Sequence, residues 1–305
     1  MQNIEYLLLV DAGNTRIKWV LCRNTPLPID GANDLTVFDR HIFLNNTVIA
    51  EGACLHADLG KLNLPAEALQ NNTALRIVNV AGAQIESSLK QFFEVKLNRN
   101  VVSWFSTSAA SGNVINGYDN IHQLGADRWA ALIAAWYLVQ ANCVVVNAGT
   151  AVTIDVLNGL PESSHPKLNG FDPLNKKLNG FLQAHFKGGL ILPGLALMQQ
   201  CLLNQTAEIS AKVKLQNTLP LPENAAIASN TAFAIQLGAL QAVCGAIYNV
   251  VNSFSTQTSL PTIIISGGNA DEIANALQNR VPHQTPLNII TVAHLVPYGL
   301  YLQRT

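Results

Sequence analysis

A short polar turn near the start of the chain has the residue types to hold an anion and a divalent cation. The turn lies between two apolar runs, Tyr6–Val10 and Ile17–Cys22, and reads D-A-G-N-T-R. Gly13 permits close backbone approach, and Asn14 and Thr15 offer small hydrogen-bond donors. Such a turn suits an anion held by backbone N–H groups, with Asp11 placed to hold a divalent ion directly or through water. The alternative is an ordinary tight hairpin turn with Asx capping.

A second turn of the same kind follows in the middle of the chain. An apolar strand is expected at Cys143–Asn147 and another at Val152–Leu157, and the turn between them contains Gly149 and Thr150. Two hairpins that each bring a small polar turn to one point are what a phosphate clamp needs. The pair of turns therefore indicates phosphate binding more specifically than either turn alone.

Charged residues also stand at the start of a predicted helix. The run Asp127–Val139 is rich in Ala and Leu, which predicts a helix with Asp127 and Arg128 in its first turn. The helix dipole stabilises an acid there, so capping is an alternative to a chemical role for Asp127. The dipole disfavours an arginine at this end. A ligand carboxylate or phosphate at the helix start would account for Arg128.

Length and composition describe a core-rich globular protein. The chain has 305 residues, 49% apolar and 12% charged, with a net charge of −1. This charge argues against nucleic-acid or membrane-surface binding by bulk electrostatics. No apolar run is expected to reach a membrane span, and no signal peptide is evident, so we expect a cytoplasmic protein without nucleic-acid or membrane partners. Five scattered cysteines without a CxxC pair favour buried, reduced thiols.

Alternating apolar segments predict an α/β chain. Further strands are expected at 47–53, 76–81, 101–105, 188–194, 262–266 and 289–292, and further helices at 85–95, 195–203, 232–254, 271–278 and 294–302. Residues 23–75 are otherwise polar and mixed, with a possible helix start at 62–70. Residues 158–187 read as an inserted hairpin tip or flexible loop. The Gly267-Gly268 turn after its strand suits a nucleoside against backbone, although a plain strand-to-helix turn is an equal alternative.

The motifs repeat one theme in two halves, and in this order they resemble the actin, sugar-kinase and heat-shock ATPase superfamily. Within it, the chain closely resembles type III pantothenate kinases. The motifs that carry the resemblance are Asp11–Lys18, Asn116–Tyr118, Gly125–Arg128, Gly149–Thr153, Gly189–Gly194 and Asn230-Thr231. The resemblance implies an α/β fold with two ribonuclease H-like lobes, at 1–125 and 126–305. Each lobe would have a mixed sheet flanked by helices, with a nucleotide cleft between the lobes.

The resemblance also implies an activity, which is ATP-dependent phosphorylation of pantothenate to 4′-phosphopantothenate, the first step towards coenzyme A. The first phosphate-binding hairpin would consist of Asp11, Ala12, Gly13, Asn14, Thr15, Arg16, Ile17 and Lys18. Thr150 would contact ATP from the second turn. Mg²⁺ would bridge phosphate oxygens and be held mainly through water, with Asp11 as its carboxylate.

The acceptor side of the site follows from the same resemblance. Asp127 would be the base that takes the hydroxyl proton, and Gly125, Ala126 and Arg128 would surround pantothenate, with Arg128 pairing with its carboxylate. Tyr118 would hydrogen-bond or pack against pantothenate, with core packing as the alternative. Thr231 would reach pantothenate across the interface of a homodimer.

One position departs from the family pattern. The family usually has Asp before the second Gly-Thr turn, where it helps to bind potassium or ammonium, and this chain has Asn147. An amide oxygen can coordinate such an ion but brings no charge, so weaker binding is expected. The insert at 158–187 is also longer than the family's usual hairpin tip.

Two other functions remain open on the sequence alone. One is another small-molecule kinase of the superfamily, such as a sugar or acetate kinase. The other is a nucleotide-binding regulatory relative without kinase activity, which Asn147 and the insert suggest. The chain has no evident basic helix-turn-helix, which weighs against direct DNA binding.

Overall fold

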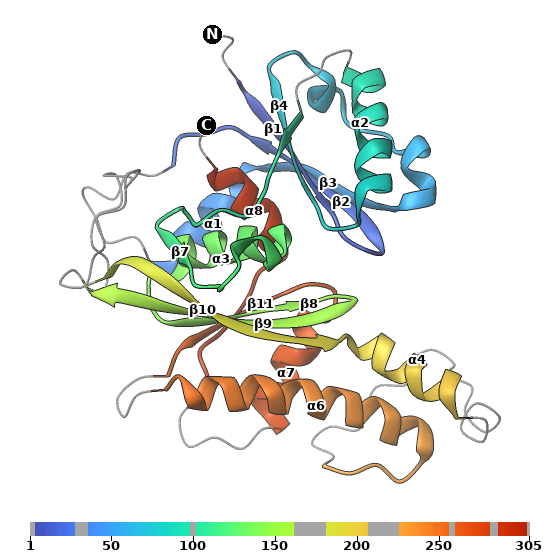
Figure 1. The fold of residues 1–305 in the computed structure, drawn as a ribbon, viewed down its shortest axis with the longest axis vertical. Coiled ribbons are helices and arrows are strands. Elements are labelled where there is room, and N and C mark those ends of the chain that lie inside the picture. The colour runs from blue at the N-terminus through green and yellow to red at the C-terminus, as the bar shows by residue number, and fades with distance from the viewer. Residues whose placement is uncertain are drawn as a thin grey trace. The chain divides into compact units, whose positions relative to one another are not determined.

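The chain folds into two compact units (Figure 1). The computed structural model describes residues 4–27, 36–97, 102–161, 181–206, 226–255, 260–280 and 286–303. The first unit comprises Met1–Asn142, Leu157–Lys187 and His294–Thr305, and the second comprises Cys143–Val156 and Gly188–Ala293. The chain therefore leaves the first unit twice and returns to it twice.

A five-stranded mixed sheet forms the centre of the first unit, in the order β3-β2-β1-β4-β5. Its strands are β1 (Tyr6–Ala12), β2 (Arg16–Arg23), β3 (Val48–Leu55), β4 (Thr73–Asn79) and β5 (Val102–Trp104). The β1/β2 and β2/β3 pairs are antiparallel, and β4 pairs in parallel with both β1 and β5. The predicted first hairpin is therefore confirmed. In β1, Leu7–Val10 is fully buried because the strand lies in the middle of the sheet with both faces covered.

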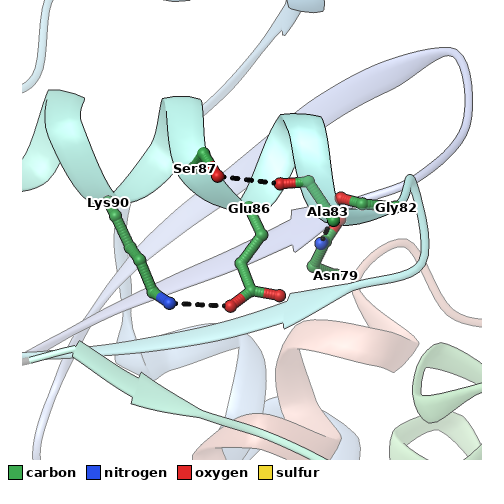
Figure 2. A network of polar contacts seen from close by, with 6 residues as sticks. All are labelled: Asn79, Gly82, Ala83, Glu86, Ser87 and Lys90. Atoms are coloured by element: carbon green, nitrogen blue, oxygen red, sulfur yellow. Dashed lines mark hydrogen bonds and ion pairs between the residues drawn. The ribbon is translucent and has the colours of Figure 1, made fainter.

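Helix α2 (Ala83–Leu97) covers one face of this sheet with Leu89, Phe93 and Leu97. Figure 2 shows how the helix begins. Asn79 Nδ2, at the end of β4, donates to the Gly82 carbonyl at 3.0 Å, and Ser87 Oγ donates to the Ala83 carbonyl at 3.1 Å. Lys90 Nζ lies 2.8 Å from Glu86 Oε1, an i,i+4 ion pair on the exposed face. A short turn, bridged by the Asn79 side chain, thus joins the helix to the strand before it.

Helix α1 (Val37–Thr47) was not predicted from the sequence pattern, and it lies in the segment interpreted as polar and mixed. Thr36 and Asp39 form a capping box at its start. Arg40 of this helix is buried, and its NH1 donates to the carbonyl of Leu138 at 3.1 Å. The possible helix at 62–70 is represented only by the short 3₁₀ helix Ala66–Leu69, after another at His56–Lys61. Helix α1 therefore supports the C-terminal end of a neighbouring helix.

That neighbour is α3 (Ala126–Val139), which packs against α8 (Leu295–Leu302) within the first unit. Nearly all of its residues from Arg128 onward are buried. The compact units therefore do not divide the chain at residues 125 and 126, since α3 belongs with the first sheet. The assignment of two lobes with that boundary stays a prediction.

The other sheet has seven strands in the order β12-β11-β8-β9-β10-β7-β6. Its strands are β6 (Ala110–Ser111), β7 (Val114–Asn116), β8 (Cys143–Ala148), β9 (Ala151–Pro161), β10 (Phe181–Pro193), β11 (Thr262–Ser266) and β12 (Ile289–Thr291). The units share β9 and β10 between them, while β6 and β7 lie wholly in the first unit. The order 10-9-8-11-12 repeats the order 3-2-1-4-5 of the first sheet. The α/β fold with two mixed sheets and one repeated theme is confirmed.

Among the described residues, the second unit also contains helices α4 (Leu195–Gln205), α6 (Thr231–Ser253) and α7 (Ala270–Arg280). Helices α6 and α7 pack on β8, β9 and β11 through one apolar cluster (Figure 1). By length and composition, α6 is apolar enough to cross a membrane, so the expectation that no apolar run is long enough is wrong. Buried core helices pass the same test, and Leu240, Val243 and Ile247 of α6 lie in this core.

Two smaller expectations also need correction. The ends of the predicted insert at 158–187 are strand, because β9 continues to Pro161 and β10 begins at Phe181, while 162–180 lie outside the described residues. Burial of the cysteines holds for Cys22, Cys143 and Cys244, but Cys201 on α4 is exposed. Burial raises the pKa of the Cys143 thiol to about 12, as expected for an inert core thiol.

Candidate active site

The β1–β2 turn presents its backbone and small polar side chains to solvent. The N–H of Gly13 donates to the Arg16 carbonyl at 3.1 Å, which closes the turn. Asn14, Thr15 and Arg16 are exposed at its tip. A ring nitrogen of His56, Nε2, lies 2.8 Å from the Gly13 carbonyl oxygen and steadies the turn from outside the hairpin.

Three other residues of the predicted hairpin site have different surroundings. The side chains of Ala12 and Ile17 are buried in the core, so only their backbone is available to a nucleotide. Lys18 is exposed and stands directly opposite Asp11 across the β1/β2 pair. The hairpin can therefore offer backbone donors, small hydroxyl and amide groups, and one cation beside Asp11.

Asp11 lies close enough to Asp127 for the Asp127 carboxylate to shift the pKa of Asp11. Burial and the Asp127 carboxylate raise the pKa of Asp11 to about 7, and Lys18 acts in the opposite direction. Burial also raises the pKa of Asp127, against the effects of the Arg128 backbone N–H and charge. Two partly desolvated carboxylates of this kind attract a cation, because a positive charge offsets both burial and mutual repulsion.

The backbone at the start of α3 gives Asp127 its direction. Gly125 is the N-cap residue, and an added Cβ there would lie 2.7 Å from Asp127 Oδ1. The carboxylate accepts a hydrogen bond from the Arg128 N–H at 2.8 Å. Asp127 therefore does interact with the free N–H groups of its own helix, as the capping interpretation expected. The carboxylate oriented in this way is near enough to Asp11 to raise its pKa.

Arg128 and Tyr118 form a direct pair. Arg128 NH1 donates to the Tyr118 hydroxyl at 3.0 Å, and its guanidinium carbon lies 5.6 Å from the centre of the Tyr118 ring. Tyr118 also stacks on the buried ring of Phe186. These contacts match the alternative of core packing with a satisfied hydroxyl, and the contact of Tyr118 with pantothenate stays a prediction.

Glycine-rich segments converge on the second turn, within the second unit. The Gly194 N–H donates to the Thr150 carbonyl at 2.9 Å, and a Cβ on Gly194 would lie 2.3 Å from the Gly149 oxygen. Gly267 has φ +105°, and a Cβ there would lie 2.4 Å from the Ala148 oxygen. Three segments of the sequence thus meet around Thr150, which only glycines at these positions allow.

The predicted site residues fall into two groups. The first unit holds the Asp11 hairpin, Tyr118 and the Gly125–Arg128 corner, and the second unit holds Asn147, Thr150 and Thr231. Asn147 is half-buried at the end of β8, and Thr231 is exposed at the start of α6. Sequence reasoning missed His56 and Phe186. His56 has no local motif, and Phe186 fell within the segment interpreted as an insert.

Comparison with known sequences identifies the family. The sequence model for type III pantothenate kinase matches residues 7–162 and 182–253. The chain belongs to the type III pantothenate kinase family. Two curated members illustrate the similarity. A type III pantothenate kinase of a Janthinobacterium species is 36% identical over 303 residues, which is 97% of this chain and 96% of that protein. The enzyme of Methylobacillus flagellatus is 33% identical over 302 residues, which is 98% of each chain.

A solved structure with a different description is also similar to this type III pantothenate kinase family member. It is described as a conserved putative Baf family transcriptional activator from Campylobacter jejuni. It is 18% identical, with a TM-score of 0.48, and the match covers 96% of this chain and 94% of that one. The resemblance to type III pantothenate kinases predicted from the motifs is confirmed by the family match.

Proposed function

We propose that this protein transfers the terminal phosphoryl group of ATP to the hydroxyl of pantothenate, which gives 4′-phosphopantothenate in the first step of coenzyme A synthesis. Family membership over most of the chain supports this activity. The observation in the structure that supports it most is that Asp127 lies close enough to Asp11 to raise its pKa, so an acceptor base would stand near a phosphate-binding turn.

Asp127 is the base that takes the acceptor hydroxyl proton. Burial raises its pKa, which brings a carboxylate nearer to the range in which it exchanges protons at neutral pH. Arg128 pairs with the substrate carboxylate, and Tyr118, Gly125 and Ala126 surround the same ligand. Phosphoryl transfer depends chiefly on positioning and on neutralising charge, with a smaller contribution from the base.

The two phosphate-binding turns hold ATP mainly through backbone groups. Residues 11–18 supply the first turn and Thr150 belongs to the second. The chemistry of Asp11 fits a divalent ion, because a carboxylate whose pKa is raised to about 7 by burial and a second carboxylate gains from a nearby cation. Mg²⁺ would supply charge neutralisation of the phosphates, with Asp11 holding it mainly through water.

A homodimer completes the site in this proposal, since Thr231 reaches the substrate of the partner subunit. The exposed face of α6 supports a helix–helix contact. It carries small residues at helical spacing, and the glycines Gly238 and Gly245 have open space where a side chain would stand. Thr231 lies on the same exposed face at its first turn. Small residues let two helices approach closely, which suits an interface of this kind.

Asn147 stands where the family pattern has an aspartate that helps to bind a monovalent cation. We expect a weak or altered response to potassium or ammonium, because the amide contributes no charge. Turnover is measured over a potassium titration for wild type, Asn147→Asp and Asn147→Ala. Asn147→Asp should respond more strongly than wild type. A strong, saturable requirement in wild type that vanishes in Asn147→Ala would show that the amide is sufficient.

The activity itself is tested with purified protein, Mg²⁺ and ATP against a panel of acceptors, with ADP formation as the readout. Turnover with pantothenate and none with sugars or acetate supports the proposal. Turnover of a sugar or acetate without pantothenate would favour another kinase of the superfamily. Binding of ATP without turnover of any acceptor would favour a regulatory relative. A cytoplasmic location and the absence of nucleic-acid and membrane partners remain predictions.

A further inference from the structure

Phe186 is a fully buried aromatic residue of β10 that packs against Tyr118 of the proposed substrate site. Its side chain is 0% exposed. The parallel register of β10 and β7 places it opposite Asn116, two residues before Tyr118. The Phe186 and Tyr118 rings stack with 5.1 Å between their centres and 29° between their planes. Phe186 therefore covers one face of the Tyr118 ring.

The backbone that carries Tyr118 is held against the same strand. Asn116 Oδ1 accepts from the Tyr118 N–H at 3.1 Å, and Asn116 Nδ2 donates to the Ser108 carbonyl at 3.3 Å. A Cβ at Gly117 would lie 2.0 Å from the Phe186 carbonyl oxygen. The turn can lie this close to β10 only because residue 117 is glycine. Both the ring and the backbone of Tyr118 are thus placed by β10.

Tyr118 in turn holds Arg128. The hydroxyl accepts from Arg128 NH1 at 3.0 Å, and the guanidinium carbon lies 5.6 Å from the ring centre, within cation–π range. Arg128 is only 5% exposed. An arginine side chain loses much rotamer freedom when it is fixed, and an arginine fixed before the ligand arrives binds a carboxylate more tightly. Phe186 therefore orients Tyr118, and Tyr118 in turn orients Arg128.

We propose that Phe186 is a positioning residue for acceptor binding, which directs Arg128 through the Tyr118 ring. The inference rests on the proposed function, in which Arg128 and Tyr118 bind pantothenate. An aliphatic side chain at position 186 fills part of the space but offers no flat face for stacking. The Tyr118 ring and the guanidinium then sample more orientations, and the effect falls on binding of the acceptor rather than on binding of ATP.

The test is steady-state kinetics of Phe186→Leu with each substrate varied. We expect the KM for pantothenate to rise about 3- to 10-fold, the range of an aromatic pair, with the KM for ATP unchanged. Phe93→Leu is the matched control, because Phe93 is also buried in the first unit but lies on α2, where it packs in the core against the first sheet. It should lower the melting temperature and leave the KM for pantothenate unchanged. If Phe186→Leu does not fold, Phe186→Met is assayed in the same way.

A second arm asks whether the effect passes through Tyr118. In a Tyr118→Leu background, the Phe186→Leu change should have no further effect on the KM for pantothenate. A folded Phe186 variant with an unchanged KM, or an effect that persists in that background, overturns the inference. If Arg128→Lys and Tyr118→Leu themselves leave the KM for pantothenate unchanged, the proposed substrate contacts fail instead, and the two failures are distinguished.

Discussion

Two effects of the surroundings shift the pKa of the Asp127 carboxyl in opposite directions. Burial raises the pKa of its carboxyl, while the N–H and charge of Arg128 favour the ionised form. The result is a carboxylate with a fixed direction that can still accept a proton. Helix capping and base catalysis are therefore compatible, because the hydrogen bond from the Arg128 N–H orients the group without enclosing it.

Asp127→Asn tests the base directly. The amide keeps the shape of the side chain and can still accept from the Arg128 N–H, but it cannot take a proton. Turnover should fall roughly 10²-fold or more with the fold retained, the usual scale for a general base. Initial rates and circular dichroism measure the two effects. Wild-type rates in the variant would remove Asp127 from the catalytic role.

Asp11 gives a pH-dependent stability. Its folded pKa of about 7 lies above the unfolded value of 3.8, so the folded state binds this proton more tightly. The associated stability is present at low pH and is lost as pH rises through about 7. Asp11→Asn carries no such charge. Without Mg²⁺, its melting temperature should exceed that of wild type by several degrees at pH 8 and by much less at pH 5.

Thermal melts from pH 5 to 8 in the presence of a chelator measure this difference. The exposed Asp119→Asn is the control, and it should follow wild type at every pH. A difference between Asp11→Asn and wild type that is constant over the whole range would show that the Asp11 carboxyl does not titrate there.

At the scale of elements, helix α3 carries the proposed base at its N-terminal end and is supported by a buried arginine at the other end. Arg40 of α1 donates to the Leu138 carbonyl at the C-terminal end, where a cation also complements the helix dipole. Gln140 ends the helix in a left-handed conformation, with φ 48°. The position of Asp127 at the start of α3 thus depends on a helix whose other end is bound by α1.

Arg40→Met tests this support. Met fills much of the same volume but leaves the helix end without its donor, so stability should fall by about 2 kcal/mol. Urea unfolding measures the change, with the exposed Arg23→Met as the control. Equal stability of the Arg40 variant and wild type would contradict a capping role.

The sequence predicted the long regular elements well, because their patterns are local. The buried run of β1, the Ala- and Leu-rich helix α3 and the glycine turn after β11 were found near their observed positions. Helix α1 was missed because its face is only weakly apolar, although Thr36 and Asp39 carry a capping-box pattern. Phe186 and His56 could not be predicted as site residues, since their roles arise from contacts with residues far along the chain.

At the scale of the whole molecule, the proposed homodimer depends on the small residues of α6. Gly238→Leu adds a bulky side chain on the exposed face, where the single chain has room for it. Leucine favours helix more than glycine does, so the isolated subunit should not lose stability. Light scattering should show a monomer, and pantothenate turnover should fall because Thr231 of the partner subunit is lost.

The same change at Gly60, an exposed glycine of the first unit with open space around it, is the control. Gly60→Leu should remain a dimer with wild-type turnover. If Gly238→Leu also remains a fully active dimer, this face of α6 is not the interface.

The most direct test follows the phosphoryl group itself. Wild-type protein is incubated with pantothenate, Mg²⁺ and ATP labelled with ¹⁸O in its terminal phosphate, and the products are resolved by mass spectrometry. We predict labelled 4′-phosphopantothenate in equal amount to ADP. ADP formed with all of the label in inorganic phosphate, or label found in another acceptor while pantothenate is unchanged, would contradict the assignment.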